Sequence, residues 1–89
     1  MIARRVRVTG RVQGVFFRAW TSEQAGSLGV SGWVRNCPDG SVEAQLEGPE
    51  AAVRHLVERL HDGPPQARVE RVDVTEAFVE DAKGFAVRH

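Results

Sequence analysis

Residues 10–18, GRVQGVFFR, include the residue types that a binding site for a small anion requires. Gly10 and Gly14 permit backbone conformations that other residues avoid. Backbone N–H groups in such a loop can surround a phosphate or carboxylate, above all where a helix begins. Arg18 ends the stretch, and a guanidinium can bind the same anion through two parallel hydrogen bonds. On their own, these residues are equally compatible with a tight turn beside a surface arginine.

A second polar residue, Asn36, ends the stretch GWVRN at residues 32–36. An amide side chain carries a hydrogen-bond donor and an acceptor without a charge. It can therefore orient a water molecule next to an anion. The alternative interpretation is that Asn36 only starts the turn before Cys37 and Pro38.

The first strand and helix determine where the glycine loop lies. Val6 and Val8 alternate with arginines, a pattern that predicts a half-buried strand leading into Gly10. From Phe17 to about Leu28 the apolar residues share one helical face, and Gly29 is expected to end this helix. The loop therefore lies between a strand and the N-terminus of a helix.

The remaining elements complete a simple order. Val30 to Val34 alternates as a second strand, and a Pro-Asp-Gly turn at 38–40 leads to a third strand at 42–47. A second helix starts near Pro49, carries an apolar stripe at Val53, Leu56, Val57 and Leu60, and ends at Gly63-Pro64-Pro65.

Two short strands follow the second helix. Val72 and Val74 predict a fourth strand, in which the opposite parity of Val69 indicates a bulge. Phe85 and Val87 predict a short fifth strand at an edge. The order β-α-β-β-α-β predicts an α+β, ferredoxin-like sandwich with two helices on one face of an antiparallel sheet. We expect one domain over residues 1–89.

Composition narrows the possible partners. Twelve basic residues balance twelve acidic ones, so no net charge favours binding to nucleic acid or to an anionic membrane surface. The single cysteine, Cys37, cannot form an internal disulfide, which suits a reducing compartment. The N-terminal residues lack the apolar stretch of a signal peptide. We expect a cytoplasmic monomer that binds neither nucleic acid nor membrane.

The two motifs together resemble the acylphosphatase family, whose signatures are G-x-V-Q-G-V-x-F-R and G-W-V-x-N. GRVQGVFFR and GWVRN match both, DGSVE follows at 39–43, and the similarity continues through Gly63-Pro64-Pro65 to FAVR at 85–88. It therefore covers essentially the whole chain. His89 departs from the family, in which the last residue is often tyrosine. This departure bears on the packing of the C-terminus and on none of the roles that the family implies.

The resemblance implies an enzyme that hydrolyses the carboxyl–phosphate bond of acyl phosphates by in-line attack of water. It assigns phosphate binding to Arg18 and to the loop backbone, and water orientation to Asn36. The loop residues concerned are Gln13, Gly14, Val15, Phe16 and Phe17. It implies no cofactor and no metal, with inorganic phosphate as product and competitive inhibitor. The motifs do not specify the acyl group.

Other side chains favour structural roles. Glu43 occupies the position that an arginine would need for a cysteine-phosphatase cradle around Cys37, so we interpret Cys37 as a partly buried bystander. His55 and His61 lie on different faces of the second helix, which disfavours a metal site. We expect the Gln13 side chain to matter less than its backbone. The aromatic residues Phe16, Phe17 and Trp20 are expected to pack, and the charges of Glu43, Glu47, Arg71 and Asp73 to form a solvated sheet face.

Two other functions share features with this sequence. Acylphosphatase-like domains also occur in larger hydrogenase-maturation proteins that handle carbamoyl phosphate, so a non-catalytic module that binds phosphate or carbamoyl phosphate is the alternative. RNA-recognition domains share the same order of elements, but they carry aromatic residues on the first and third strands. The corresponding stretches here, ARRVRVT and SVEAQLE, have none.

Overall fold

A computed structural model describes all residues from 1 to 89. Seven elements follow one another along the chain: β1 (Ile2–Arg11), α1 (Phe17–Leu28), β2 (Ser31–Asn36), β3 (Val42–Gly48), α2 (Glu50–Asp62), β4 (Arg68–Glu76) and β5 (Phe85–Arg88). The predicted order of elements is confirmed, and α1 begins and ends at the expected residues. No helix has the length and apolar character needed to cross a membrane.

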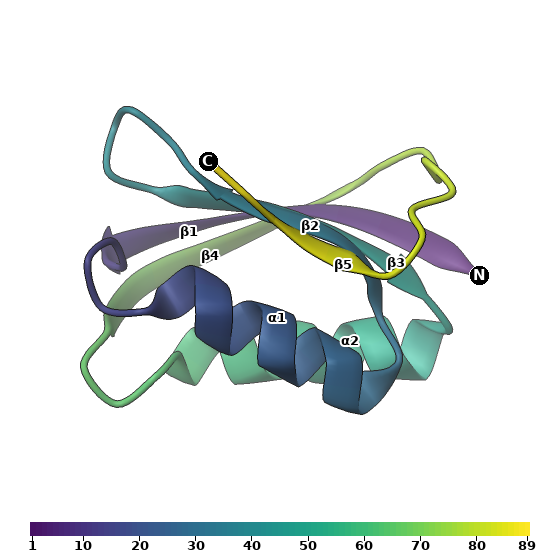
Figure 1. Cartoon of the computed structure of the whole chain (residues 1–89), viewed down its shortest axis with the longest axis horizontal. Helices are drawn as coiled ribbons and strands as arrows, with labels where there is room; N and C mark the ends of the chain where they lie inside the picture. The colour runs from purple at the N-terminus through teal and green to yellow at the C-terminus, as the bar shows by residue number, and fades with distance from the viewer.

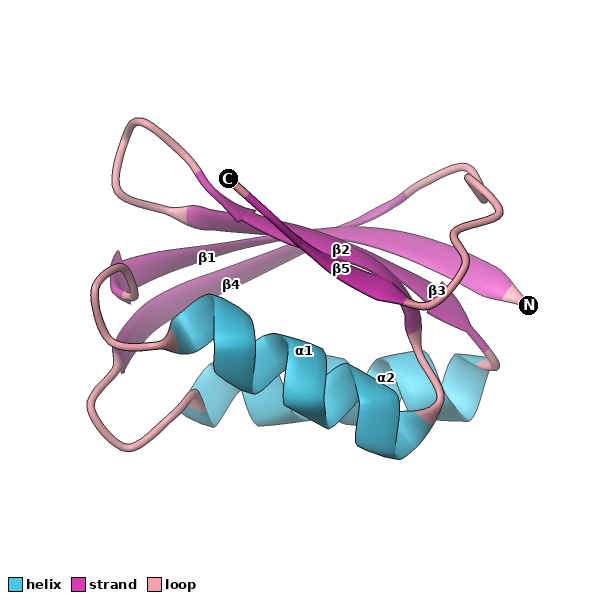
Figure 2. Cartoon of the chain, in the orientation of Figure 1, coloured by secondary structure: helices cyan, strands magenta, loops and turns pink.

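The five strands form one sheet in the order β4-β1-β3-β2-β5. Both helices cover the same face of this sheet, as Figures 1 and 2 show. This is the expected ferredoxin-like α+β sandwich. All neighbouring strands are antiparallel except β2 and β5, which run parallel, so the short last strand makes the sheet mixed.

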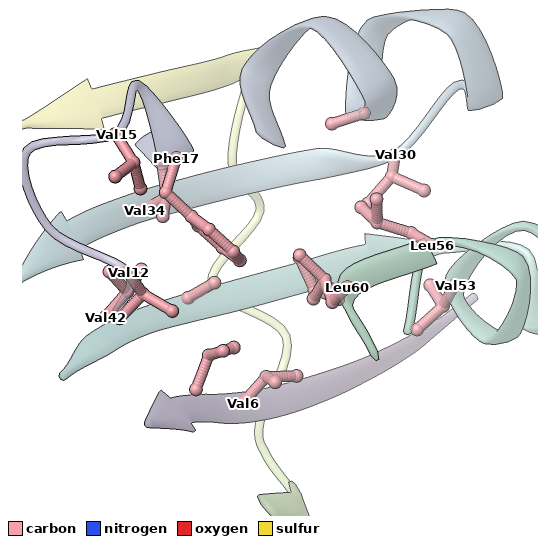
Figure 3. Close-up of a cluster of buried hydrophobic side chains, with 14 residues drawn as sticks. Val6, Val12, Val15, Phe17, Val30, Val34, Val42, Val53, Leu56 and Leu60 are labelled. Atoms are coloured by element: carbon pink, nitrogen blue, oxygen red, sulfur yellow. The ribbon is translucent and has the colours of Figure 1, made fainter. Parts of the chain in front are cut away.

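The core fills the space between the helices and the sheet. Apolar side chains from the helices, from the central strands and from the loop before α1 meet there (Figure 3). Phe17, Leu46, Leu56 and Leu60 are its largest members. Because Val12 and Val15 of the loop are also buried, the loop is fixed against the same core that holds the sheet.

A β-bulge lies at the end of β1 that leads into the glycine loop. Thr9 pairs with Arg71 whereas Gly10 pairs with Val69, which leaves Glu70 as the extra residue on β4. This confirms the bulge predicted near Val69. Gly10 has a φ of 125°, and a Cβ there would lie 2.3 Å from the Arg68 carbonyl oxygen. The bulge therefore requires glycine at this position.

The face of the sheet opposite the helices is not solvated along β3, and the prediction for Glu43 and Glu47 is wrong. Their exposed fractions are only 8% and 1%, and Gln45 between them is fully buried. The chain between β4 and β5 lies over this face (Figure 1). The Glu47 carboxylate accepts hydrogen bonds from Gln45 Nε2 at 2.9 Å and from the backbone N–H groups of Glu80 and Ala82 at 2.7 and 3.2 Å. Arg71 is exposed, as expected.

These hydrogen bonds decide the charge of Glu47. Burial alone would raise the pKa of this carboxyl, but the hydrogen bonds from Gln45 and from the backbone of residues 80–82 outweigh burial and lower the pKa below its usual range. Glu47 thus stays ionised and ties the β4–β5 connection to β3.

Arginines around Trp33 attach the last strand to the same face. The guanidinium carbons of Arg88, Arg5 and Arg35 lie 4.4, 4.8 and 5.7 Å from the centre of the Trp33 ring. Such contacts between cations and an aromatic ring are attractive. Hydrogen bonds to Glu43 at 2.6 and 2.9 Å raise the pKa of Arg35. Arg88 on β5 is thereby packed against β2.

Candidate active site

The loop before α1 has the backbone shape expected of an anion site. Gly14 and Phe16 both have positive φ, 74° and 64°, and Val15 between them does not. Alternation of this kind turns successive N–H groups towards one side of the chain. None of the backbone hydrogen bonds outside the helices and strands is donated by residues 13–16. The N–H groups of this loop therefore remain available to a ligand.

The N-terminus of α1 adds a positive electrostatic potential next to this loop. Phe16 is the N-cap, it makes no side-chain capping bond, and the first turn contains no acidic residue. Helix geometry leaves the first N–H groups of α1 without intrahelical partners, and the helix dipole makes this end positive. Phe17, buried in the core, holds the helix in place, as expected. Phe16 is 78% exposed, so the prediction that it packs is wrong for this residue.

The Gln13 side chain connects the loop to the turn between β2 and β3. Its Nε2 donates to the carbonyl oxygens of Cys37 and Ser41, each at 2.8 Å. The expectation that this side chain matters less than the Gln13 backbone did not include this structural contact. The turn itself is closed by Asp39, which accepts hydrogen bonds from the hydroxyl and the N–H of Ser41. These bonds lower the pKa of Asp39.

A pocket of about 360 Å³ lies where this loop, α1, β2 and β5 meet. Arg18 and Asn36, which are 18 positions apart in the sequence, both line it. We call it the phosphate pocket; its lining residues are Val12, Gly14, Phe16, Phe17, Arg18, Ala19, Asn36, Val87 and His89. Of the other predicted site residues, Gln13 and Val15 belong to the loop but not to the pocket wall.

Arg18 is held by the end of the chain. Its Nη1 donates to the Arg88 carbonyl oxygen at 2.7 Å and lies 3.2 Å from Nδ1 of His89. Both contacts use the same nitrogen, so Nε–H and the second terminal nitrogen can still form a fork towards an anion. Sequence reasoning missed both partners. The expectation that His89 affects only the packing of the C-terminus is wrong, because its ring lies beside Arg18 and lines the same pocket. No local pattern indicates this contact.

The polar side chains that line the phosphate pocket are neutral or cationic. Its lining contains one guanidinium, one amide and one imidazole, and no carboxylate side chain. No group of three or more histidine, cysteine, aspartate or glutamate side chains in the structure is arranged to hold a metal ion. Such a cavity can hold an anion by charge and by N–H donors, and can position a neutral molecule beside it.

The other residues considered for catalysis or metal binding lie outside the phosphate pocket. Cys37 is buried directly after β2, in agreement with its interpretation as a bystander. His55 and His61 are exposed on α2, and His61 Nδ1 contacts the Val57 carbonyl oxygen of its own helix at 3.0 Å. Neither belongs to the phosphate pocket.

Comparison with known proteins identifies the family of this chain. The acylphosphatase family model matches residues 4–87. The chain belongs to the acylphosphatase family. An acylphosphatase of Rubrobacter xylanophilus is 61% identical over 85 residues, which cover 94% of this chain and 77% of that protein. Membership and this degree of identity show acylphosphatase activity, that is, hydrolysis of small acyl phosphates.

Solved structures agree with the acylphosphatase fold. The crystal structure of acylphosphatase from Bacillus subtilis superposes with a TM-score of 0.97 at 39% identity, and both chains are covered completely. HypF of T. kodakarensis contains a similar unit, with a TM-score of 0.88 and 30% identity. That match covers the whole of this chain but only 12% of HypF.

Proposed function

We propose that the phosphate pocket binds the phosphoryl group of an acyl phosphate and directs a water molecule at its phosphorus. The observation that supports this mechanism is that Arg18 and Asn36 line one pocket together with residues of the loop, whose N–H groups at 13–16 donate no backbone hydrogen bond. The Arg18 guanidinium and the N–H groups of residues 13–18 surround the equatorial phosphate oxygens. They stabilise the negative charge that these oxygens carry in the transition state.

Asn36 orients the attacking water. It comes from the end of β2 in the sheet, whereas Gly14, Phe16 and Arg18 of the lining come from the loop and from α1, which belongs to the helix layer. A water held by the Asn36 amide therefore attacks the phosphorus from the β2 side. The pocket lining has no carboxylate side chain, and its one imidazole, that of His89, contacts the Arg18 guanidinium. We therefore assign the proton of the water to a phosphate oxygen of the substrate.

The leaving group needs no acid. An acyl phosphate expels a carboxylate, and carboxylic acids have pKa values of about 4 to 5. The departing oxygen is thus stable as an anion at neutral pH. Positioning and charge stabilisation are sufficient for this reaction, and both are supplied by the residues of the pocket.

Further properties belong to the same proposal. We propose that the enzyme needs no metal or cofactor, that inorganic phosphate competes with substrate, and that residues 1–89 act as one domain. The balanced charge supports the absence of nucleic-acid and membrane partners, and the single cysteine, which is buried, supports a cytoplasmic location. We propose that the protein acts there as a monomer.

Hydrolysis of benzoyl phosphate by purified variants tests the mechanism. Loss of one preorganised donor typically lowers kcat by about 10²–10³, so Arg18→Ala should lose at least this much and should no longer be inhibited by phosphate. Asn36→Ala should lose kcat and retain phosphate inhibition. Arg54→Ala, which removes an exposed arginine of α2, is the matched control and should behave like the wild type.

Three outcomes would contradict the proposal. Normal kinetics of folded Arg18→Ala would show that Arg18 does not bind the phosphate. A rate abolished by EDTA would show that a metal takes part. If Asn36→Ala kept kcat and lost only affinity, Asn36 would be a binding residue rather than a water ligand. Phosphate binding without turnover by the wild-type chain would favour the non-catalytic module.

A further inference from the structure

A second hollow of about 320 Å³ adjoins the phosphate pocket, on the other side of the first turn of α1. We call it the Trp20 hollow. Trp20 and the Pro64-Pro65 pair from the turn after α2 line it, and it shares Phe16 and Ala19 with the phosphate pocket. Its volume lies at the lower end of the range for small-molecule sites, about 300 to 1,000 Å³. One small group can therefore occupy it.

Phe16 at the boundary has features that the fold alone does not require. It adopts a left-handed conformation, with φ 64° and ψ 25°, which is unfavourable for a residue with a side chain. Its ring is 78% exposed, so it gains little from burial in the core. Glycine would give the loop the same backbone shape with less strain. A large apolar ring at this position is explained if a ligand packs against it.

In-line attack directs the acyl group towards this hollow. This step depends on the function proposed above. Attacking and leaving oxygens lie on opposite sides of the phosphorus. With water held by Asn36 on the side of the sheet, we place the departing acyl oxygen on the side of the loop and α1. This side carries Phe16 and Ala19, the two residues shared with the Trp20 hollow.

The lining of the hollow indicates which acyl groups fit. The half-buried Trp20 ring packs on the core residue Phe17, with ring centres 5.7 Å apart and planes tilted by 56°, so the indole is held in place. Pro64 beside it is buried, and proline has little conformational freedom to lose. A fixed aromatic and proline surface favours a flat apolar group. Glu23 is the only charged residue of the lining, and its carboxylate repels an acyl group with a second negative charge.

We propose that the Trp20 hollow is the acyl-group subsite, and that the enzyme prefers acyl phosphates with flat, uncharged, apolar acyl groups. Aromatic acyl phosphates are the class that this surface fits best. Short acyl groups reach the phosphate pocket without filling the hollow, and acyl groups that end in a carboxylate are disfavoured by Glu23.

Specificity ratios of two variants test this proposal. For each protein, kcat/KM is measured with benzoyl phosphate, acetyl phosphate and succinyl phosphate. Loss of an apolar pocket contact typically changes specificity by about 10- to 200-fold. We therefore expect Trp20→Ala to lower kcat/KM for benzoyl phosphate at least tenfold more than for acetyl phosphate. Glu23→Gln should raise the ratio of succinyl to acetyl phosphate several-fold, whereas Glu58→Gln on the exposed surface of α2 should not.

The results separate this proposal from the mechanism. If wild type hydrolyses all three substrates in an Arg18-dependent way but both variants leave the ratios unchanged, the subsite is refuted and the mechanism stands. Equal losses of Trp20→Ala on benzoyl and acetyl phosphate would also refute the subsite, since they indicate a general structural effect. If Trp20→Ala does not fold, as judged by circular dichroism, Glu23→Gln and the milder Trp20→Leu decide by the same ratios.

Discussion

The two glycines of the GRVQGVFFR motif are required for different physical reasons, and substitution by alanine should separate them. In Gly10→Ala the new methyl carbon would lie 2.3 Å from the Arg68 carbonyl oxygen and 2.8 Å from the Glu70 nitrogen. The β-bulge would have to open to make room. In Gly14→Ala the added carbon meets no atom within 4 Å, so only the positive φ of 74° is unfavourable.

These geometries give different losses of stability. For Gly10→Ala, overpacking and a φ of 125° each contribute about 1–3 kcal/mol, for a combined loss of about 2–6 kcal/mol. For Gly14→Ala, a left-handed residue with a Cβ costs about 1–2 kcal/mol. Gly26 is the matched control, because it lies inside α1 with open space around it. Gly26→Ala should increase stability by about 0.5–1 kcal/mol.

Equilibrium unfolding in urea, followed by the fluorescence of Trp20 and Trp33, measures all three free energies of unfolding. Benzoyl phosphate hydrolysis is measured on the same samples. Gly14 lines the phosphate pocket, so Gly14→Ala should lose activity out of proportion to its small loss of stability. The reasoning is refuted if Gly10→Ala is no less stable than Gly14→Ala, or if Gly14→Ala retains full activity.

Two further predictions concern the contacts that hold the loop and the last strand. The lowered pKa of Glu47 means that its ionised form stabilises the folded state. This stabilisation is fully present above the ordinary glutamate pKa of about 4.3. It is lost as the pH falls through the lower pKa that Glu47 has in the folded state. Urea unfolding at pH 7 and pH 3 should therefore show a stability difference between wild type and Glu47→Gln that shrinks in acid, and a constant difference would contradict it. Gln13→Met removes the donor to the Cys37 and Ser41 carbonyl oxygens and should cost about 1–3 kcal/mol. It should also weaken inhibition by phosphate; unchanged inhibition would show that this contact does not position the loop.

The elements and the position of the glycine loop were predictable because their signals are local. Alternation and helical periodicity extend over a few neighbouring residues, and α1 accordingly begins at Phe17 as predicted. The glycine loop directly precedes this helix, so its general shape could be inferred as well. The catalytic roles of Arg18 and Asn36 stay predictions until variants are measured.

The sheet order and the buried charges were not predictable in the same way. Alternation shows that Glu43 and Glu47 face away from the helices. It does not show that residues 80–82 cover Glu47, or that three arginines surround Glu43. The β4–β5 connection has no periodic pattern, and it is held by hydrogen bonds between groups about 33 positions apart. The contact of Arg18 with the Arg88 carbonyl oxygen spans 70 positions. Only the pairing of β5 with β2, which no local pattern specifies, places the two together.

The parallel pairing of β5 with β2 has a consequence for biosynthesis. All motif residues have been translated once Asn36 is added, yet the carbonyl that restrains the Arg18 guanidinium belongs to residue 88. A nascent chain still attached to the ribosome before this point contains the glycine loop and Arg18 without this restraint. Full catalytic competence should thus arise only after the final strand has emerged and docked, so that turnover reports on completed folding.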